Sequence, residues 1–282
     1  MRVLITGGYH EDIERMGWIM KLSRTFVLLL ATTVLAGLAV SCGSASQTVK
    51  IGLLSPQTGP IAQYAPGFED AGKVAISELN ETHSGDFVFE LIVGDSGCDG
   101  TQAGTAAQTL IDSGVAAIVG AACSGATLGA IAVAKEAGVP MVSYASTSPG
   151  LSTADDNGHL FRVVPSDAQQ AVALAAVAAA AGASNPAVLY MTNDYGAGLG
   201  DNFASSWSGS VCTQVGYDPT EGSYDASSLA QSVIDGGCDS VLLMSYATDG
   251  AAIMEALSSQ GFTGSMIGAD GLADAKFTES FT

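Results

Sequence analysis

Short apolar segments alternate with longer amphipathic ones along most of this chain, from Thr48 to Gly268. The series opens with a strand pattern at Thr48–Ser55, a helix pattern at Ala65–Glu81 and a second strand pattern at Phe87–Val93. Strands that alternate with helices of this length predict parallel strands joined by crossover helices. The alternation therefore predicts an α/β protein.

The predicted elements fall into two runs, separated by a loop of Ser, Thr, Pro, Asp and Gly at residues 146–158. The chain is expected to cross between the runs at Val164–Asp167. Two α/β units in one chain form a crevice, and open parallel sheets bind ligands at the carboxyl ends of their strands. We therefore expect two lobes, each a parallel sheet flanked by helices, at residues 48–165 and 166–266. The remaining predicted strands are 116–120, 140–143, 160–164, 187–192, 211–216, 240–245 and 265–268, and the remaining helices are 102–112, 126–137, 168–181, 197–207, 227–235 and 249–259.

The helix predicted at Ala65–Glu81 carries Phe68, Val74, Ile76 and Leu79 on one broad stripe. Apolar residues at this spacing lie on one face of an α-helix, and such a face packs against the protein core.

An export signal precedes the alternating region, at residues 20–41. It begins with the basic residues Lys21 and Arg24 and continues with an uncharged apolar run of fifteen residues at 26–40. That run is short for a membrane span and typical of the core of a signal peptide. Residues 1–19 fit no export pattern and are interpreted as an upstream extension.

The segment that ends at Cys42, Leu38-Ala39-Val40-Ser41-Cys42, resembles a bacterial lipobox, whose cysteine is lipidated and becomes the first mature residue. The usual Leu three places before the cysteine is replaced by Ala39, and ordinary cleavage without a lipid is the alternative. The resemblance implies a lipid on Cys42 and a tether at residues 42–47. It also implies a location outside the cytoplasm, on the bacterial cell membrane, in the periplasm or at the cell surface.

The charge balance argues against a nucleic-acid partner. The 282 residues include 9 basic and 28 acidic side chains, and four of the basic but only three of the acidic ones precede Ser41. The remainder therefore carries a net charge of −20, which repels phosphate backbones. Because the acids are scattered rather than clustered, solubility is the preferred explanation.

Four cysteines remain after Cys42, an even number that favours disulfides in an oxidising compartment. They allow three pairings. No CxxC motif occurs, and only His83 and His159 follow the signal, so the sequence argues against a zinc site and we expect no metal or other cofactor.

Two short motifs suggest enzymes but lack the necessary partners. Gly67–Lys73 fits most of a phosphate-binding loop, yet Val74 stands where Ser or Thr is required. Gly94–Gly97 reads GDSG, as around a protease serine, but no suitable histidine lies upstream in the mature chain. We therefore expect no catalytic residues and no enzyme activity.

Several ordered landmarks resemble one family, the periplasmic binding proteins for branched-chain amino acids, which are type I clamps that feed ABC transporters. The resemblance runs from Lys50 to Phe277, about four-fifths of the chain. The landmarks are IGLLSPQTGPIAQYAPG (51–67), CDGTQA (98–103), GAACSGAT (120–127), GVPMVSYASTSPGL (138–151), FRVVPSDAQQA (161–171), NDYGAGL (193–199) and GADGL (268–272). In this family the chain crosses between the lobes three times and its last part rebuilds the first lobe. The resemblance implies that residues 267–282 return to lobe 1 and that the rest of that lobe is missing through C-terminal truncation.

The resemblance also implies a set of residues that bind a zwitterion. Ser124, expected to cap the helix at 126–137, and the pair Ser146 and Thr147 match contacts to the ligand carboxylate. A helix start offers free N–H groups and partial positive charge, which suits an anion. Asp270 matches the acidic partner of the ligand ammonium, where the family often has the longer Glu. Second-lobe residues that close over the ligand match Tyr195 and Tyr246, and an aromatic residue near the ligand side chain matches Tyr64.

Cys98 and Cys123 match a disulfide of the same family, and the bond would hold Ser124 in place. Such a bond contributes about 3 kcal/mol by the loop-entropy relation. Cys212 and Cys238 precede or begin neighbouring predicted strands, and we predict a second disulfide between them.

The resemblance implies the substrate-binding component of an ABC transporter, with a small extracellular solute and a membrane permease as partners. We expect a monomer that binds a branched-chain or other amino acid. Urea, short amides and aromatic acids are alternative ligands. A sensory ligand-binding ectodomain is an alternative function, against which the lipobox argues. A secreted hydrolase is disfavoured because no base–nucleophile pair is evident.

Overall fold

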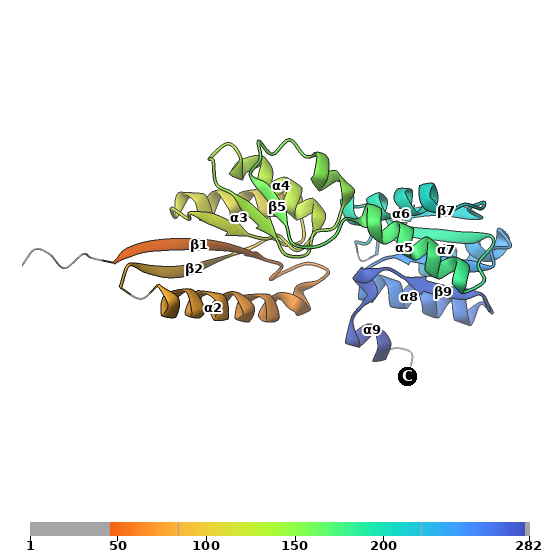
Figure 1. The fold of residues 1–282 in the computed structure, drawn as a ribbon. Helices are drawn as coiled ribbons and strands as arrows, with labels where there is room; N and C mark the ends of the chain where they lie inside the picture. The colour runs from red at the N-terminus through yellow and green to blue at the C-terminus, as the bar shows by residue number, and fades with distance from the viewer. Residues whose placement is uncertain (1–45, 84, 221, 280–282) are drawn as a thin grey trace, which may run out of the picture. The chain divides into compact units, whose positions relative to one another are not determined.

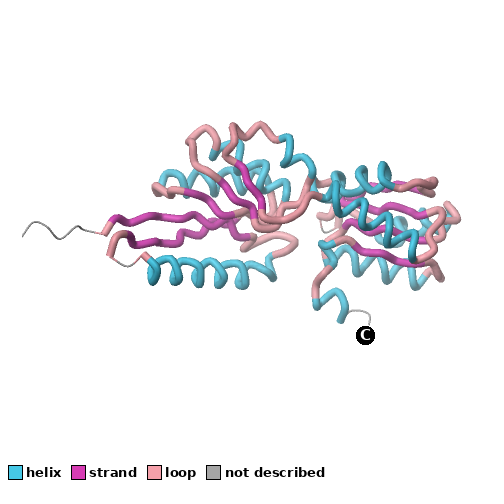
Figure 2. Tube along the Cα trace, in the orientation of Figure 1, coloured by secondary structure: helices cyan, strands magenta, loops and turns pink. Residues whose placement is uncertain are grey.

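The strands form two sheets, as the alternating pattern predicts (Figures 1 and 2). The computed structural model describes residues 46–83, 85–220 and 222–279. Both sheets lie within one compact unit, residues 48–282. The first sheet has the order β2-β1-β3-β4-β5 and the second the order β7-β6-β8-β9. The strands are β1 (Gln47–Ser55), β2 (Phe87–Asp95), β3 (Ala117–Val119), β4 (Met141–Ser143), β5 (Leu160–Arg162), β6 (Pro186–Met191), β7 (Thr213–Tyr217), β8 (Ser240–Met244) and β9 (Ser265–Gly268).

Parallel pairing runs through both sheets. In the first, β1–β3, β3–β4 and β4–β5 pair in parallel, with Leu53 opposite Val119. In the second, β6 pairs in parallel with β7 and β8, and β8 with β9, with Leu189 opposite Leu243. Strand β9 carries the second sheet to Gly268, two residues past the lobe boundary expected at 266.

Helices fill the crossovers between strands. In the first half, α3 and α4 pack side by side and α2 lies on the other side of the sheet (Figure 1). In the second half, α5 packs on α6 and α7 on α8. The helices are α2 (Ala65–Thr82), α3 (Gly100–Asp112), α4 (Ser124–Ala134), α5 (Asp167–Ala180), α6 (Asp194–Ser206), α7 (Ala226–Asp235), α8 (Ala247–Ser259) and α9 (Ala275–Glu279), with short 3-10 turns η1 (Ala62–Tyr64), η2 (Pro149–Thr153) and η3 (Asp270–Leu272).

Side-chain caps set where several helices begin. The Asp99 carboxylate accepts the N–H of Gln102, and the Asn193 amide oxygen accepts the N–H of Gly196. Such caps satisfy N–H groups that have no partner within the helix. They explain why α3 and α6 begin two and three residues earlier than the sequence pattern indicated.

The helix pair α3–α4 packs at backbone contact. A Cβ added at Gly129 would lie 2.0 Å from the carbonyl oxygen of Gly100, so only glycine allows this approach. Below the pair, Leu54, Ile118 and Met141 are completely buried in the core of the first sheet. The start of α4, which matters for the site below, is therefore held on a tightly packed support.

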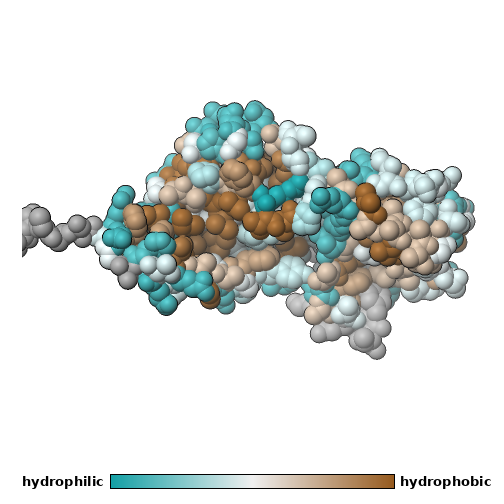
Figure 3. Space-filling view, in the orientation of Figure 1, coloured by the Kyte–Doolittle hydropathy of each residue, from teal (hydrophilic) through white to brown (hydrophobic). Residues whose placement is uncertain are grey.

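The helix with the apolar stripe is present as α2, but one residue of the stripe, Val74, has a side chain that is 59% exposed. Phe68, Ile76 and Leu79 are half-buried. Helical spacing indicates which residues share a face but not how widely the neighbouring sheet covers it. Figure 3 shows further apolar residues gathered over the first sheet on the visible face. Phe161 on β5 is also more than half exposed.

The expected signal peptide, upstream extension and lipidated Cys42 lie outside the described residues. In the part of the chain that is described, no helix combines the length and the apolar character needed to cross a membrane.

Candidate ligand-binding site

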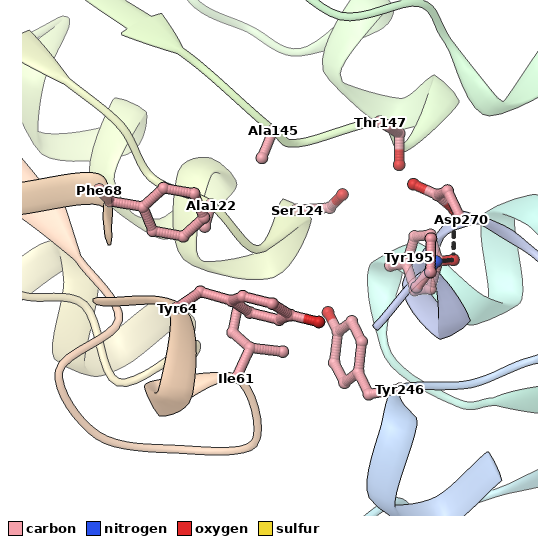
Figure 4. A pocket seen from close by; sticks show the side chains of 12 residues that line it. Ile61, Tyr64, Phe68, Ala122, Ser124, Ala145, Thr147, Tyr195, Tyr246 and Asp270 are labelled. Carbon is pink, nitrogen blue, oxygen red and sulfur yellow. Dashed lines mark hydrogen bonds between the residues drawn. The ribbon is translucent and has the colours of Figure 1, made fainter. Parts of the chain in front are cut away.

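A pocket of about 310 Å³ lies where loops from the carboxyl ends of both sheets meet (Figure 4). Six of the seven residues predicted to bind ligand line it: Tyr64, Ser124, Thr147, Tyr195, Tyr246 and Asp270. The other lining residues are Ile61, Phe68, Ala122, Ala145, Gly271 and Ala273. Residues more than 200 positions apart in the sequence therefore face one cavity.

One wall of the pocket is suited to an anion. Helix α4 begins at Ser124, and the first N–H groups of a helix have no partner within it. The Ser124 oxygen accepts the N–H of Ser148 at 3.1 Å, which leaves its hydroxyl proton available to a ligand. Figure 4 shows the Ser124 and Thr147 hydroxyl groups pointing into the same space. Together these donors can hold a carboxylate.

The expected cap by Ser124 is wrong. The N-cap of α4 is Cys123, which makes no side-chain capping bond, and Ser124 is the first helical residue. The pattern Cys-Ser-Gly suggested a serine cap because serine is common at that position. In the structure Cys123, which is joined to Cys98, is the extended residue before the helix.

Ser146 does not line the pocket, contrary to the prediction. Its side chain is buried, and its hydroxyl contacts the carbonyl oxygens of Ala121 and Ala122 and the Thr127 hydroxyl, at 2.7–3.1 Å. Ser146 therefore fixes the loop after β4, and Thr147 next to it is the residue that faces the cavity.

The opposite wall carries a carboxylate. Asp270 follows β9, and its Oδ1 accepts the Tyr195 hydroxyl at 2.5 Å and the Gln170 amide at 3.0 Å. Burial, and then the charge of Asp270, raises the pKa of Tyr195 well above its ordinary value, so this phenol remains a neutral donor. Figure 4 shows the Asp270 side chain directed toward Ser124 and Thr147. A wall suited to an anion thus faces a wall suited to a cation.

The remaining wall is apolar and aromatic. The Tyr64 hydroxyl donates to Asp274 at 2.5 Å, which leaves the ring of Tyr64 facing the pocket beside Ile61 and Phe68. Burial, followed by the hydrogen bond to Asp274, raises the pKa of Tyr64 to about 12. On the other side, the rings of Tyr195 and Tyr246 stack with centroids 5.5 Å apart. This part of the pocket suits the side chain of an apolar ligand.

Both predicted cysteine pairs are joined in the structure, Cys98 to Cys123 and Cys212 to Cys238. The first bond anchors the residue that precedes Ser124, and the Cys98 sulfur lies 3.8 Å from the Tyr246 hydroxyl. Neither cysteine of the second bond lines the pocket. One disulfide therefore supports the site and the other supports the second sheet.

Sequence reasoning did not identify Asp167 and Gln170, which lie in the first turn of α5 next to the site. Asp167 is completely buried and Gln170 contacts Asp270. The only feature of the sequence that could have indicated them is the position of Asp167, a carboxylate at the start of a predicted helix beside the expected crossing between the lobes. Among the described residues, no cluster of His, Cys, Asp and Glu could hold a metal ion.

The carboxyl group of Asp167 predicts a pH dependence of stability. Burial, and then the charge of Asp270, raises the pKa of Asp167 from 3.8 to about 7. A carboxyl whose folded-state pKa is raised destabilises the fold as pH rises from about 4 to about 7, because the charged form is disfavoured. Asp167→Asn should therefore raise the free energy of unfolding by about 2–4 kcal/mol above pH 7 and by little near pH 4.

Urea unfolding across this pH range measures the difference. The exposed Asp86→Asn variant is the control and should show no gain of this size. A gain that is the same at all pH values would contradict a buried, titrating Asp167.

Comparison with known proteins identifies the family. The profile of a family described as "Periplasmic binding protein" matches residues 48–277. The chain is 27% identical over 253 residues to the "Leu/Ile/Val-binding protein homolog 3" of Brucella melitensis biotype 1, and 29% identical over 253 residues to the "Leu/Ile/Val-binding protein BraC3" of Rhizobium johnstonii. Each alignment covers 88% of this chain and 68% of the relative.

Solved structures give the same result. A leucine binding protein from Thermotoga maritima shares 28% identity at a TM-score of 0.72, covering 82% of this chain and 66% of that one. A branched-chain amino acid transporter substrate binding protein from Streptococcus pneumoniae, in complex with isoleucine, shares 25% identity at a TM-score of 0.72. That alignment covers 84% of this chain and 68% of the other, so the present chain spans about two thirds of the length of its relatives. With two parallel sheets, a pocket at their carboxyl edges and a family match over residues 48–277, this chain belongs to the periplasmic binding proteins, solute-binding proteins that act outside the cytoplasm.

Proposed function

We propose that this protein is the substrate-binding component of an ABC transporter and that it captures an amino acid, with a branched-chain side chain as the preferred class. One observation carries the proposal: hydrogen-bond donors at Ser124 and Thr147 and the carboxylate of Asp270 line a single pocket. An α-amino acid carries an anion and a cation on one carbon, and this pocket offers a complement to each.

The apolar wall supports the choice of side chain. Ile61, Phe68 and the aromatic ring of Tyr64 lie beside Ala122 and Ala145, and none of these five residues brings a charge to the pocket. Burying a leucine or isoleucine side chain against them contributes about 1.5–3 kcal/mol. The names of the relatives, which specify leucine, isoleucine and valine, support the same class.

Capture is proposed to work through closure. A ligand that contacts Ser124 and Thr147 on one side and Asp270 and Tyr195 on the other favours the conformation in which both sets are near it. Its binding free energy shifts the population toward that form. The closed form then docks onto a permease, which hydrolyses ATP elsewhere in the complex. The protein itself performs no chemical step.

The lipid on Cys42 belongs to the same proposal. The lipobox-like sequence supports attachment to the cell membrane through that cysteine, followed by a short tether. The anchored protein is proposed to be a monomer. The anchor keeps the clamp close to its permease, which raises the effective concentration of each for the other.

Calorimetric titration of the mature, full-length protein tests the proposed ligand class. The panel contains L-leucine, urea, benzoate and D-glucose as representatives of an amino acid, a short amide, an aromatic acid and an unrelated solute. We expect heat of binding for L-leucine at micromolar concentrations and none for glucose. Binding of urea or benzoate in preference to every amino acid tested would assign the pocket to one of the alternative ligand classes.

A further inference from the structure

Gln170 makes a two-way contact with Asp270 that spans 100 residues of sequence. Its Nε2 donates to Asp270 Oδ1 at 3.0 Å, and its Oε1 accepts the backbone N–H of Asp270, also at 3.0 Å. The orientation of the amide is therefore fixed, since its nitrogen must face the carboxylate and its oxygen must face the N–H. Gln170 lies on α5, just after the first crossing, and Asp270 follows β9. The contact joins two crossing segments of the chain.

Asp167 holds Gln170 in this orientation. Its Oδ1 accepts a second hydrogen bond from Gln170 Nε2, at 2.8 Å, so both amide hydrogens point at carboxylates. Asp167 is completely buried, and its backbone N–H donates to the carbonyl oxygen of Thr147 at 2.9 Å. The same residue thus contacts the loop of the anion-binding wall and, through Gln170, the cation-binding one.

These bonds leave one oxygen of Asp270 for a ligand. Among the described residues, the hydrogen bonds to this carboxylate, from Gln170 and from Tyr195, both end on Oδ1. Oδ1 already accepts two hydrogen bonds and can accept few more, whereas Oδ2 can still accept hydrogen bonds from a ligand. The rotation of the carboxylate is fixed by two donors from α5 and α6, which are rigid supports.

The choice of a neutral amide matters for binding a cation. A lysine or arginine in the place of Gln170 would fix Asp270 equally well but would neutralise it and repel an ammonium group. Glutamine orients the carboxylate and leaves its full charge. Above about pH 7, where the nearby carboxyl group of Asp167 is ionised, it adds negative potential on the same side and favours a cation further.

We propose that Gln170, oriented by Asp167, is a positioning residue that presents Asp270 Oδ2 to the ammonium group of the ligand and so makes the pocket selective for ligands that carry one. This inference rests on the proposed binding of an amino acid and adds to it the residues that determine selectivity for the ammonium.

The test compares two ligands on one variant. Gln170→Met keeps the length of the side chain and removes both hydrogen bonds to Asp270. L-Leucine and its des-amino analogue, 4-methylpentanoate, are titrated calorimetrically into the full-length protein. We expect the affinity for leucine to fall about 10-fold and that for 4-methylpentanoate to change less than about 2-fold, since only leucine offers a partner to Oδ2. Gln169→Met, an exposed neighbour on the same helix, is the matched control and should change neither affinity.

A second variant distinguishes positioning from packing. Gln170→Glu has the same shape, but its ionised form lacks the donor and lies beside Asp167 and Asp270. At about pH 8 it should weaken leucine binding more than Gln170→Met does, and at about pH 5.5, where the carboxyl between two acids is protonated and can donate again, affinity relative to the unsubstituted protein at the same pH should recover. Tyr195 is neutral at both values, because burial raises its pKa well above the ordinary value. Asp167, whose pKa is raised to about 7, changes its charge between the two values, and the comparison with the unsubstituted protein at the same pH cancels that change.

The outcomes separate the two proposals. Equal losses for leucine and its des-amino analogue, or no loss for leucine, would overturn the positioning role while leaving amino acid binding intact. An unsubstituted protein that binds neither leucine nor any other amino acid would contradict the proposed function itself, and the role of Gln170 with it.

Discussion

Asp270→Asn is expected to lower the affinity for L-leucine by about 30- to 100-fold, or about 2–3 kcal/mol. The substitution keeps the shape and the acceptor that receives the Tyr195 hydroxyl, but it removes the charge that faces the ligand ammonium. The ammonium would then be desolvated against a neutral amide. Calorimetric titration of both proteins at the same pH measures the loss.

The des-amino analogue and a charge-retaining variant are the controls. Affinity for 4-methylpentanoate should stay the same or increase with Asp270→Asn, because a carboxylate ligand gains nothing from a nearby anion. Asp270→Glu should retain most of the affinity for leucine, since it keeps the charge. An equal loss for both ligands with Asp270→Asn would mean that Asp270 supports the loop rather than binding the ammonium.

Removing the disulfide between Cys98 and Cys123 is expected to destabilise the fold by about 3 kcal/mol and also to weaken ligand binding. The bond closes a segment with a sequence separation of 25 residues, and its second cysteine is the N-cap of α4, immediately before Ser124. Without the bond, the start of α4 is free to move, so its N–H groups lose their fixed direction toward the ligand. Urea unfolding and leucine titration of the Cys98→Ser, Cys123→Ser double variant measure the two effects.

The second disulfide is a matched control within the same chain. Cys212 and Cys238 have a sequence separation of 26 residues, so loop entropy predicts nearly the same loss of stability for Cys212→Ser, Cys238→Ser. Neither cysteine lines the pocket, and leucine affinity of the folded protein should be unchanged. If both double variants lost affinity equally, the first disulfide would have no special role in the site.

The alternating pattern of the sequence predicted every strand of the structure and each of its long helices, with ends that differ by at most three residues. Local signals suffice here because parallel strands buried on both faces are short apolar runs, and caps such as Asp99 and Asn193 mark helix starts. The exposure of Val74 could not be predicted in this way, because it depends on how far the sheet extends beside α2.

The pocket was partly predictable and partly not. Ser124, Thr147 and Asp270 each follow or begin an element at the carboxyl edge of a sheet, where a family resemblance could place them. The roles of Ser124 and Ser146 depend on which way each hydroxyl group turns, which the sequence does not show. Ser146 and Thr147 are neighbours on one loop, yet only Thr147 lines the pocket. Gln170 contacts Asp270 only because two crossing segments lie side by side in the folded protein. The sequence around either residue does not indicate this contact.

Titration of the full-length mature protein with L-leucine and with its two one-charge analogues, 4-methylpentanoate and 3-methylbutylamine, tests the two-pole pocket most directly. If Ser124 and Thr147 hold the anion while Asp270 holds the cation, leucine binds and each analogue binds at least about 30-fold more weakly. If either analogue binds as tightly as leucine, the corresponding wall does not recognise a charge, and the assignment of this crevice to amino acids is wrong.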